Sequence, residues 1–214
     1  MYRPAQFDET RLPVLHAAMR AAGLAILVTG GEAGLQASHL PLLLDADEGP
    51  HGTLLGHLAR PNPQWRDAAG QPAMAIFSGL DAYVSPSAYP TKRETGMVVP
   101  TWNYIAIHAH GVLEVEEDPA RLRALVARLT ERHEAGRAAP WRIDDAPEAF
   151  IQKQLRGIVG ITLRITRLEG KWKMSQNRNP ADRAGVATSL AASDDPTERA
   201  VGALVGSLPG PQAG

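Results

Sequence analysis

Apolar residues recur at helical spacing in several stretches of the chain. The first helix is predicted from Leu12, Leu15, Met19 and Ala22. We expect Asp8 to cap its first turn and Gly23 to end it, because these residue types satisfy orphan backbone groups at helix ends. Further helices are predicted over residues 118–136, 147–156, 179–190 and 196–205.

Short apolar runs and alternating runs predict strands in the rest of the chain. They cover residues 24–28, 35–45, 52–57, 73–77, 82–85, 102–116 and 158–168. Gly79 lies between two of these runs and is taken as the turn that joins them. Many antiparallel strands at this spacing favour a barrel. We therefore expect a mainly β fold with peripheral α-helices over residues 1–190, followed by a C-terminal helix and flexible tail over residues 191–214.

Composition narrows the class of protein further. The 214 residues are 44% hydrophobic and 21% charged, with a formal net charge of -1, so neither a basic nucleic-acid surface nor an acidic tail is indicated. The absence of Cys excludes disulfides, thiolate metal ligands and a cysteine nucleophile. The apolar runs are too short to cross a bilayer, and we expect a soluble, cytoplasmic protein without membrane contact.

Four polar clusters at predicted strand ends are the candidate chemistry. They occupy residues 38–41, 56–65, 99–104 and 171–178. The last cluster is rich in amides and cations, and Arg and Lys are suited to phosphate oxygens. A solvated loop before the helix at residues 179–190 is the alternative for this cluster, and the sequence leaves both readings open.

Other chemistry finds little support. His39, His57, His108 and His110 stand at no recognised metal-ligand spacing, so no metal is expected. Nucleophile-elbow, P-loop and dinucleotide-binding glycine patterns are all absent from the sequence. No residue is a persuasive acid or base, and the catalytic residues, if any, are unknown.

The clusters together resemble a known family. The series comprises Met1-Tyr2 with Pro4 and Phe7, His39-Leu40-Pro41, Gly56-His57-Leu58-Ala59-Arg60, Asn62-Pro63-Gln64-Trp65, residues 82–87 with Tyr89, residues 99–104, and Lys173 with Ser175-Gln176-Asn177-Arg178. In this order it closely resembles the PaiB-type FMN-binding negative transcriptional regulators, over nearly the whole chain to residue 190. The resemblance implies an antiparallel FMN-binding split β-barrel, and a homodimer with FMN at the subunit interface.

The resemblance also nominates cofactor-binding residues. Arg60, Lys173 and Arg178, with Ser38 or Asn62, would hold the phosphate, while Leu40, Leu58 or Trp102 would form an apolar floor for the isoalloxazine. His39, Thr101, Gln176 and Asn177 are candidates for its polar edge, and His57 belongs to the same set.

Two functions follow from this resemblance. The first is a negative transcriptional regulator that acts through flavin state or a partner. The helix over residues 118–136 mixes arginines with Glu131 and Glu134, so charge does not support direct DNA reading, although DNA stays open as a partner. The alternative is an FMN-dependent oxidoreductase, similar to flavin reductases, that acts on a small molecule with a nicotinamide donor. The sequence leaves open whether the protein is an enzyme.

Overall fold

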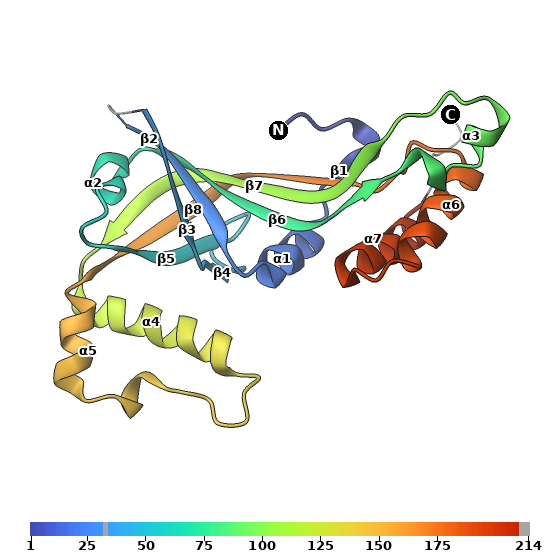
Figure 1. The fold of residues 1–214 in the computed structure, drawn as a ribbon. Helices are drawn as coiled ribbons and strands as arrows, with labels where there is room; N and C mark the ends of the chain where they lie inside the picture. The colour runs from blue at the N-terminus through green and yellow to red at the C-terminus, as the bar shows by residue number, and fades with distance from the viewer. Residues whose placement is uncertain (32–33, 210–214) are drawn as a thin grey trace. The chain divides into compact units, whose positions relative to one another are not determined.

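The computed structural model describes residues 1–31 and 34–209, and its elements follow the chain as drawn in Figure 1. The strands are β1 (Asp8–Glu9), β2 (Ala25–Gly31), β3 (Gly34–Leu40), β4 (Leu43–Asp45), β5 (Thr53–Ala59), β6 (Pro72–Val84), β7 (Thr101–Glu116) and β8 (Ile158–Lys173). The helices are α1 (Leu12–Ala21), α2 (Gln64–Ala68), α3 (Thr91–Glu94), α4 (Pro119–Glu134), α5 (Glu148–Leu155), α6 (Pro180–Ala191) and α7 (Pro196–Ser207). Short 3-10 turns are η1 (Ala5–Phe7), η2 (Pro86–Ala88) and η3 (Ile143–Asp145).

The strands of the described chain form one hydrogen-bonded sheet. Its order is β3-β2-β6-β7-β8-β5-β4, with β1 paired to β8 off this path. The antiparallel register places Ile26 opposite Ile76, and His57 opposite Gly160. The predicted antiparallel, β-rich architecture is therefore confirmed.

The chain divides into two compact units that share the long strands. The first unit comprises Met1–Leu15, Ser78–Ile107 and Glu169–Gly214, and the second comprises His16–Phe77 and His108–Leu168. Strands β6, β7 and β8 each contribute residues to both units. Each unit is described by itself below.

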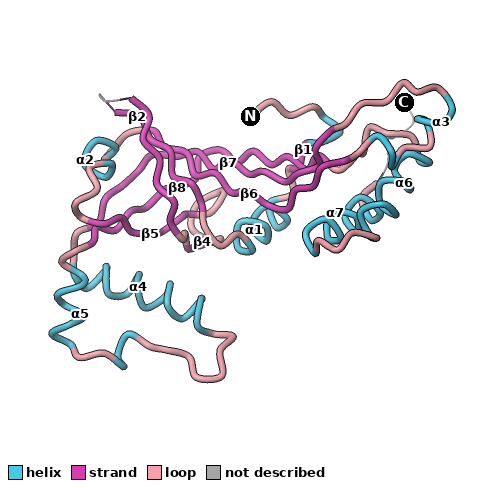
Figure 2. Tube along the Cα trace, viewed as in Figure 1, coloured by secondary structure: helices cyan, strands magenta, loops and turns pink. Residues whose placement is uncertain are grey.

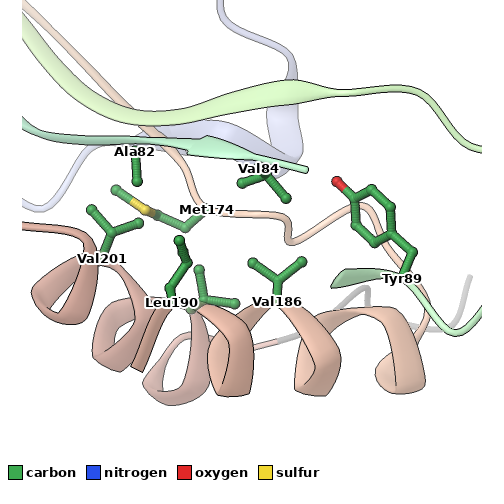
Figure 3. Packing of buried hydrophobic residues seen from close by; sticks show 8 residues of the cluster. Ala82, Val84, Tyr89, Met174, Val186, Leu190 and Val201 are labelled. Carbon is green, nitrogen blue, oxygen red and sulfur yellow. The ribbon is translucent and has the colours of Figure 1, made fainter. Parts of the chain in front are cut away.

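The first unit has a core between β6, the end of β8 and the last two helices. Figure 3 shows Ala82 and Val84 of β6 facing Met174, with Val186 of α6 and Val201 of α7 on the helical side. All of these side chains are almost fully buried, and burial of apolar surface is the main stabilising term in such a cluster. Both terminal helices therefore belong to one hydrophobic core.

The second unit has a smaller helical cluster beside its strands. Leu122 of α4 packs with Ile143 of η3 and with Ile151 and Leu155 of α5. Figure 2 shows these three elements as helical segments joined by loops. Asp118 caps α4 by accepting a hydrogen bond from the Arg121 backbone N–H at 2.9 Å, and Pro119 follows it, as the sequence predicts.

Most of the predicted elements are confirmed, but three local predictions are wrong. Asp8 does not cap α1, because it lies in β1 opposite Lys171 and its carboxylate accepts from Arg3. The run 35–45 is two strands, β3 and β4, which Pro41 and Leu42 separate.

The third wrong prediction concerns Gly79, which lies inside the continuous strand β6 and not in a turn. A Cβ on Gly79 would approach Ile105 of β7 to 2.8 Å, so the glycine permits close contact between neighbouring strands.

The predicted domain boundary at residue 190 stays a prediction. The predicted flexible tail lies outside the described residues from position 210 onward. No helix in the described ranges has the length and apolar character that a bilayer span requires.

Candidate functional site

A small polar pocket lies in the first unit, between the start of β7 and the end of β8. Thr101 and Asn103 line it from β7, Lys173 ends β8, and the following turn contributes Ser175, Asn177 and Arg178. Its volume is about 50 Å³. The pocket thus gathers four predicted cofactor ligands, Thr101, Lys173, Asn177 and Arg178, from segments about seventy residues apart.

The turn after β8 is built on an unusual backbone conformation. Ser175 has a φ of 61°, in the left-handed region that residues with a side chain seldom adopt. The fully buried Asn103 holds it there, because its amide nitrogen donates to Ser175 Oγ at 3.1 Å and its carbonyl oxygen accepts from that hydroxyl at 3.2 Å. The Arg178 backbone N–H then donates to the Ser175 carbonyl at 3.0 Å. Such local strain occurs frequently where a ligand is held.

The pocket is electrostatically positive. Lys173 donates to Thr101 Oγ1 and, at 2.6 Å, to the Trp102 carbonyl, both of which are uncharged. Burial lowers the pKa of Lys173, and the nearby charges of Lys171 and Arg178 lower it further. In the described part of the chain no carboxylate lines this pocket. An anion would therefore relieve the repulsion between these cations.

Two more predicted ligands flank this pocket without lining it. The Gln176 amide accepts from the Met174 backbone N–H at 2.7 Å and donates to the Trp172 carbonyl at 2.6 Å, so it fixes the turn. Trp102 is 53% exposed, and its ring meets the Tyr83 ring edge-on at 5.8 Å. This aromatic pair exposes apolar ring surface in the first unit.

The predicted residues of the second unit include a closed hydrogen-bond network. Ser38 Oγ donates to Gln64 Oε1 at 2.6 Å and accepts from the Asn62 amide at 3.0 Å. The Gln64 amide nitrogen donates to the Leu27 carbonyl and to Thr29 Oγ1, each at 3.1 Å. Gln64 is only 1% exposed, so this network ties α2 to β2 and β3.

Arg60 is held by several acceptors of the second unit. Its guanidinium donates to Glu117 at 2.6 Å, to the Arg156 carbonyl at 2.9 Å and to the Ile158 carbonyl at 3.0 Å. The carboxylate of Glu117 neutralises the charge. Arg60 therefore joins the end of β5 to the start of β8, and its role toward phosphate stays a prediction.

The remaining predicted residues lie on strands of the second unit. His39 is exposed on β3, whereas Leu40 is 4% exposed and belongs to the core. His57 of β5 has a buried Nδ1 atom with no hydrogen-bond partner in the described part of the chain, and burial lowers its pKa. An unpartnered buried nitrogen of this kind is one atom that a bound ligand could satisfy.

Asn103 and Gln64 lie within two of the predicted polar clusters. Sequence reasoning did not nominate either one as a site residue, although each organises its cluster. Asn103 is separated by an even number of positions from the buried Ile107 and Ala109, so all three side chains lie on the same face of β7. Asn103 is therefore a polar residue on an apolar face. A buried polar side chain is informative because it requires partners, and this signal could have identified Asn103.

The pocket fits part of a flavin nucleotide. Ligand pockets for whole small molecules measure roughly 300–1,000 Å³, so about 50 Å³ accommodates a phosphate-sized group and not an isoalloxazine. Two cations, two hydroxyls and two side-chain amides suit a phosphate. When bound, FMN would supply redox chemistry, while these residues would hold its phosphate.

Solved structures define the class to which this fold belongs. The flavocytochrome Anf3 from Azotobacter vinelandii aligns with a TM-score of 0.60 at 14% identity, covering 94% of this chain and 78% of that one. The FAD and heme binding protein from Mycobacterium smegmatis aligns with a TM-score of 0.59 at 20% identity, covering 78% and 73% of the two chains. The protein has the flavin-binding split-barrel fold, as expected.

Sequence similarity identifies the family. Residues 1–167 match the family described as "Putative FMN-binding domain", and the chain belongs to it. The protease synthase and sporulation protein PAI 2 of Bacillus subtilis is 31% identical, with 96% of each chain covered. A protein of Aspergillus fumigatus is 36% identical, over 87% of this chain and 89% of its own. The PaiB-type resemblance and the flavin cofactor are thereby confirmed.

Proposed function

We propose that this protein binds FMN through its terminal phosphate in the pocket of Thr101, Asn103, Lys173, Ser175, Asn177 and Arg178. One observation carries this assignment: Lys173 and Arg178 converge on a phosphate-sized pocket that no carboxylate of the described chain lines. A dianionic group is the natural partner of two adjacent cations, and Arg offers it a planar fork of donors.

The flavin ring requires a surface beyond this pocket. The exposed Trp102 and Tyr83 rings offer an apolar, aromatic face in the same unit. We assign the covering surface to a second copy of the chain, in a homodimer with FMN at the interface, because a twofold interface brings the same patch from both subunits together.

The biological role is negative regulation through the state of the bound flavin or through a partner. The arginines of α4 support an indirect mode of action. Arg121 pairs with Glu116 at 2.9 Å, Arg123 pairs with Asp144 at 2.5 Å, and Arg128 pairs with Asp45. These carboxylates lower the net positive charge that the helix presents to DNA phosphates.

FMN binding is tested by fluorescence titration of the purified protein with FMN and with riboflavin, which lacks the phosphate. Arg178→Ala and Lys173→Met should each weaken FMN binding about 10- to 100-fold, as expected for charge-assisted hydrogen bonds. Riboflavin affinity should stay unchanged. Arg137→Ala, at an exposed arginine of the second unit that pairs with Glu134, is the matched control. Unchanged FMN affinity in both pocket variants would refute the phosphate assignment.

The regulatory role is tested separately from cofactor binding. Duplex DNA of random sequence is selected with flavin-loaded and flavin-free protein at low and at physiological salt, because phosphate contacts weaken with salt. We expect no salt-tolerant, sequence-dependent enrichment by the protein alone. Such enrichment would instead indicate a direct repressor. Rapid anaerobic bleaching of bound FMN by a nicotinamide donor would favour the oxidoreductase.

A further inference from the structure

Tyr89 is a buried aromatic residue next to the turn that carries the pocket. It follows η2 and is 1% exposed. Figure 3 shows its ring at the edge of the cluster that Val84, Met174 and Val186 form. The residue is therefore held rigidly by the core of the first unit.

The polar hydroxyl of Tyr89 does not explain why a tyrosine occupies this position. Its oxygen is buried and meets no described residue in good hydrogen-bond geometry. Burial raises its pKa, and the charge and polar contact of the adjacent Arg178 lower it in part. An unpartnered buried hydroxyl is unfavourable. The contact that the geometry of this residue does show is made by its aromatic ring.

The face of the ring is occupied by Arg178. The guanidinium carbon of Arg178 lies 4.8 Å from the ring centroid, which is within the range of a cation–π contact. Asp182, the buried acid in the first turn of α6, does not remove this charge. Its carboxylate accepts from the Thr91 backbone N–H at 3.1 Å and from the Asn179 amide at 3.3 Å.

Arg178 is consequently fixed at both ends. Its backbone N–H is bonded to Ser175 in the turn, and its guanidinium is stacked on Tyr89. A free arginine side chain loses considerable rotamer entropy when it binds a ligand. A stacked guanidinium has already lost part of this freedom, and it keeps its charge.

We propose that Tyr89 is a positioning residue that holds Arg178 ready in the pocket, and that it thereby raises the preference of the protein for phosphorylated over unphosphorylated flavin. This inference rests on the proposed FMN site. Tyr89 itself does not line the pocket, so its effect passes through Arg178.

The test measures FMN and riboflavin affinity in variants of the full chain. Tyr89→Leu removes the ring and should weaken FMN binding about 3- to 10-fold, as expected for loss of a partly buried cation–π contact. Riboflavin affinity should not change. Tyr89→Phe keeps the ring and removes the unpartnered hydroxyl, and it should bind FMN as the wild type does.

Combination with Arg178→Ala separates positioning from a general loss of structure. Tyr89→Leu should have no further effect on FMN affinity in the Arg178→Ala background, because the side chain it positions is gone. Equal losses for FMN and riboflavin, or an unchanged loss in that background, would show that Tyr89 only supports the fold. Thermal unfolding of each variant checks that it is folded.

The remaining outcomes distinguish this inference from the proposed function. If wild-type protein fails to prefer FMN over riboflavin, the phosphate site itself is wrong. If wild type prefers FMN and Tyr89→Leu has the same preference, the site stands and the role of Tyr89 is refuted.

Tyr89→Met, which fills similar space without a ring, replaces Tyr89→Leu if that variant does not fold. Should neither fold, Arg178→Lys decides: undiminished FMN preference in this variant, which lacks the planar stack, refutes the role.

Discussion

The pocket of the first unit and the polar cluster of the second unit contain similar residue types. In the second unit the positive charge is neutralised by a carboxylate, whereas in the pocket of the first unit it is not. In the second unit, Arg60 is paired with Glu117 and bonded to two backbone carbonyls. In the first unit, the hydrogen-bond acceptors of Lys173 among the described residues are uncharged oxygens, and Arg178 is stacked on the ring of Tyr89. The sequence nominates all three cations for phosphate, and only the structure separates them.

The two polar networks differ in the same way. Ser38, Asn62 and Gln64 bond to one another and to backbone, so their donors and acceptors are used within the fold. Asn103 and Ser175 also satisfy each other, but they do so on the wall of a pocket and hold a strained turn open. A satisfied network inside the fold stabilises it, while a network on a cationic wall shapes a binding site.

The largest expected effect is on stability, in the second unit. Gln64→Ala leaves Ser38 Oγ, the Leu27 carbonyl and Thr29 Oγ1 without their partner, and it should lower the free energy of unfolding by about 2–4 kcal/mol. FMN affinity of the folded variant should stay at the wild-type level. Urea unfolding and FMN titration measure the two quantities. A specific loss of FMN affinity would instead place this network in the cofactor site.

The next effect tests the pocket wall of the first unit. Asn103→Ala leaves the Ser175 hydroxyl without its partner and should lower the free energy of unfolding by about 1–3 kcal/mol. Unlike Gln64→Ala, it should also weaken FMN binding, because the turn that carries Asn177 and Arg178 is no longer held. Riboflavin titration is the control for a general loss of affinity. Loss of stability with intact FMN affinity would contradict the difference between the two networks.

A smaller effect is expected at the neutralised arginine. Arg60→Ala removes a partly exposed ion pair and two bonds to backbone carbonyls, and it should lower the free energy of unfolding by about 1 kcal/mol. FMN affinity should change less than twofold, in contrast to Arg178→Ala. The two titrations decide the comparison, since a tenfold loss of FMN affinity in Arg60→Ala would support Arg60 as a phosphate ligand.

Local pattern predicts the secondary structure well and the contacts of individual residues poorly. Alternation identifies β7 because the buried positions Ile107 and Ala109 share one face of the strand. The same reasoning misreads Gly79, since a glycine that permits close strand approach and a glycine in a turn look alike in sequence. Asp8 is misread for a similar reason, because its strand partner Lys171 is remote in the chain.

The candidate site shows the same limit. The residues at 171–178 leave a solvated loop and a phosphate site both open, the family resemblance favours the phosphate site, and the structure brings Thr101 to this cluster. Which cations are free depends on long-range partners such as Glu117 for Arg60, 57 residues away along the chain. Neither this pairing nor the stacking of Arg178 on Tyr89 has a local signal, so it is tertiary packing that decides between a structural and a binding arginine.

The smallest expected effect concerns His57, a predicted ligand of the second unit whose buried ring nitrogen has no partner within residues 1–31 and 34–209. Burial depresses the pKa of His57 below its ordinary value near 6.5, so below that pH the unfolded chain binds a proton more readily than the folded one. Stability should therefore be complete above about pH 6.5 and should fall as the pH is lowered through that value toward the depressed pKa. His57→Gln should remove this contribution and flatten the pH dependence of the urea midpoint between these limits. His133→Gln is the control, because His133 is an exposed histidine of α4.

If FMN hydrogen-bonds to the His57 ring, saturating FMN should alter this pH dependence in wild type and not in His57→Gln. An identical pH profile with and without FMN would leave His57 outside the cofactor site.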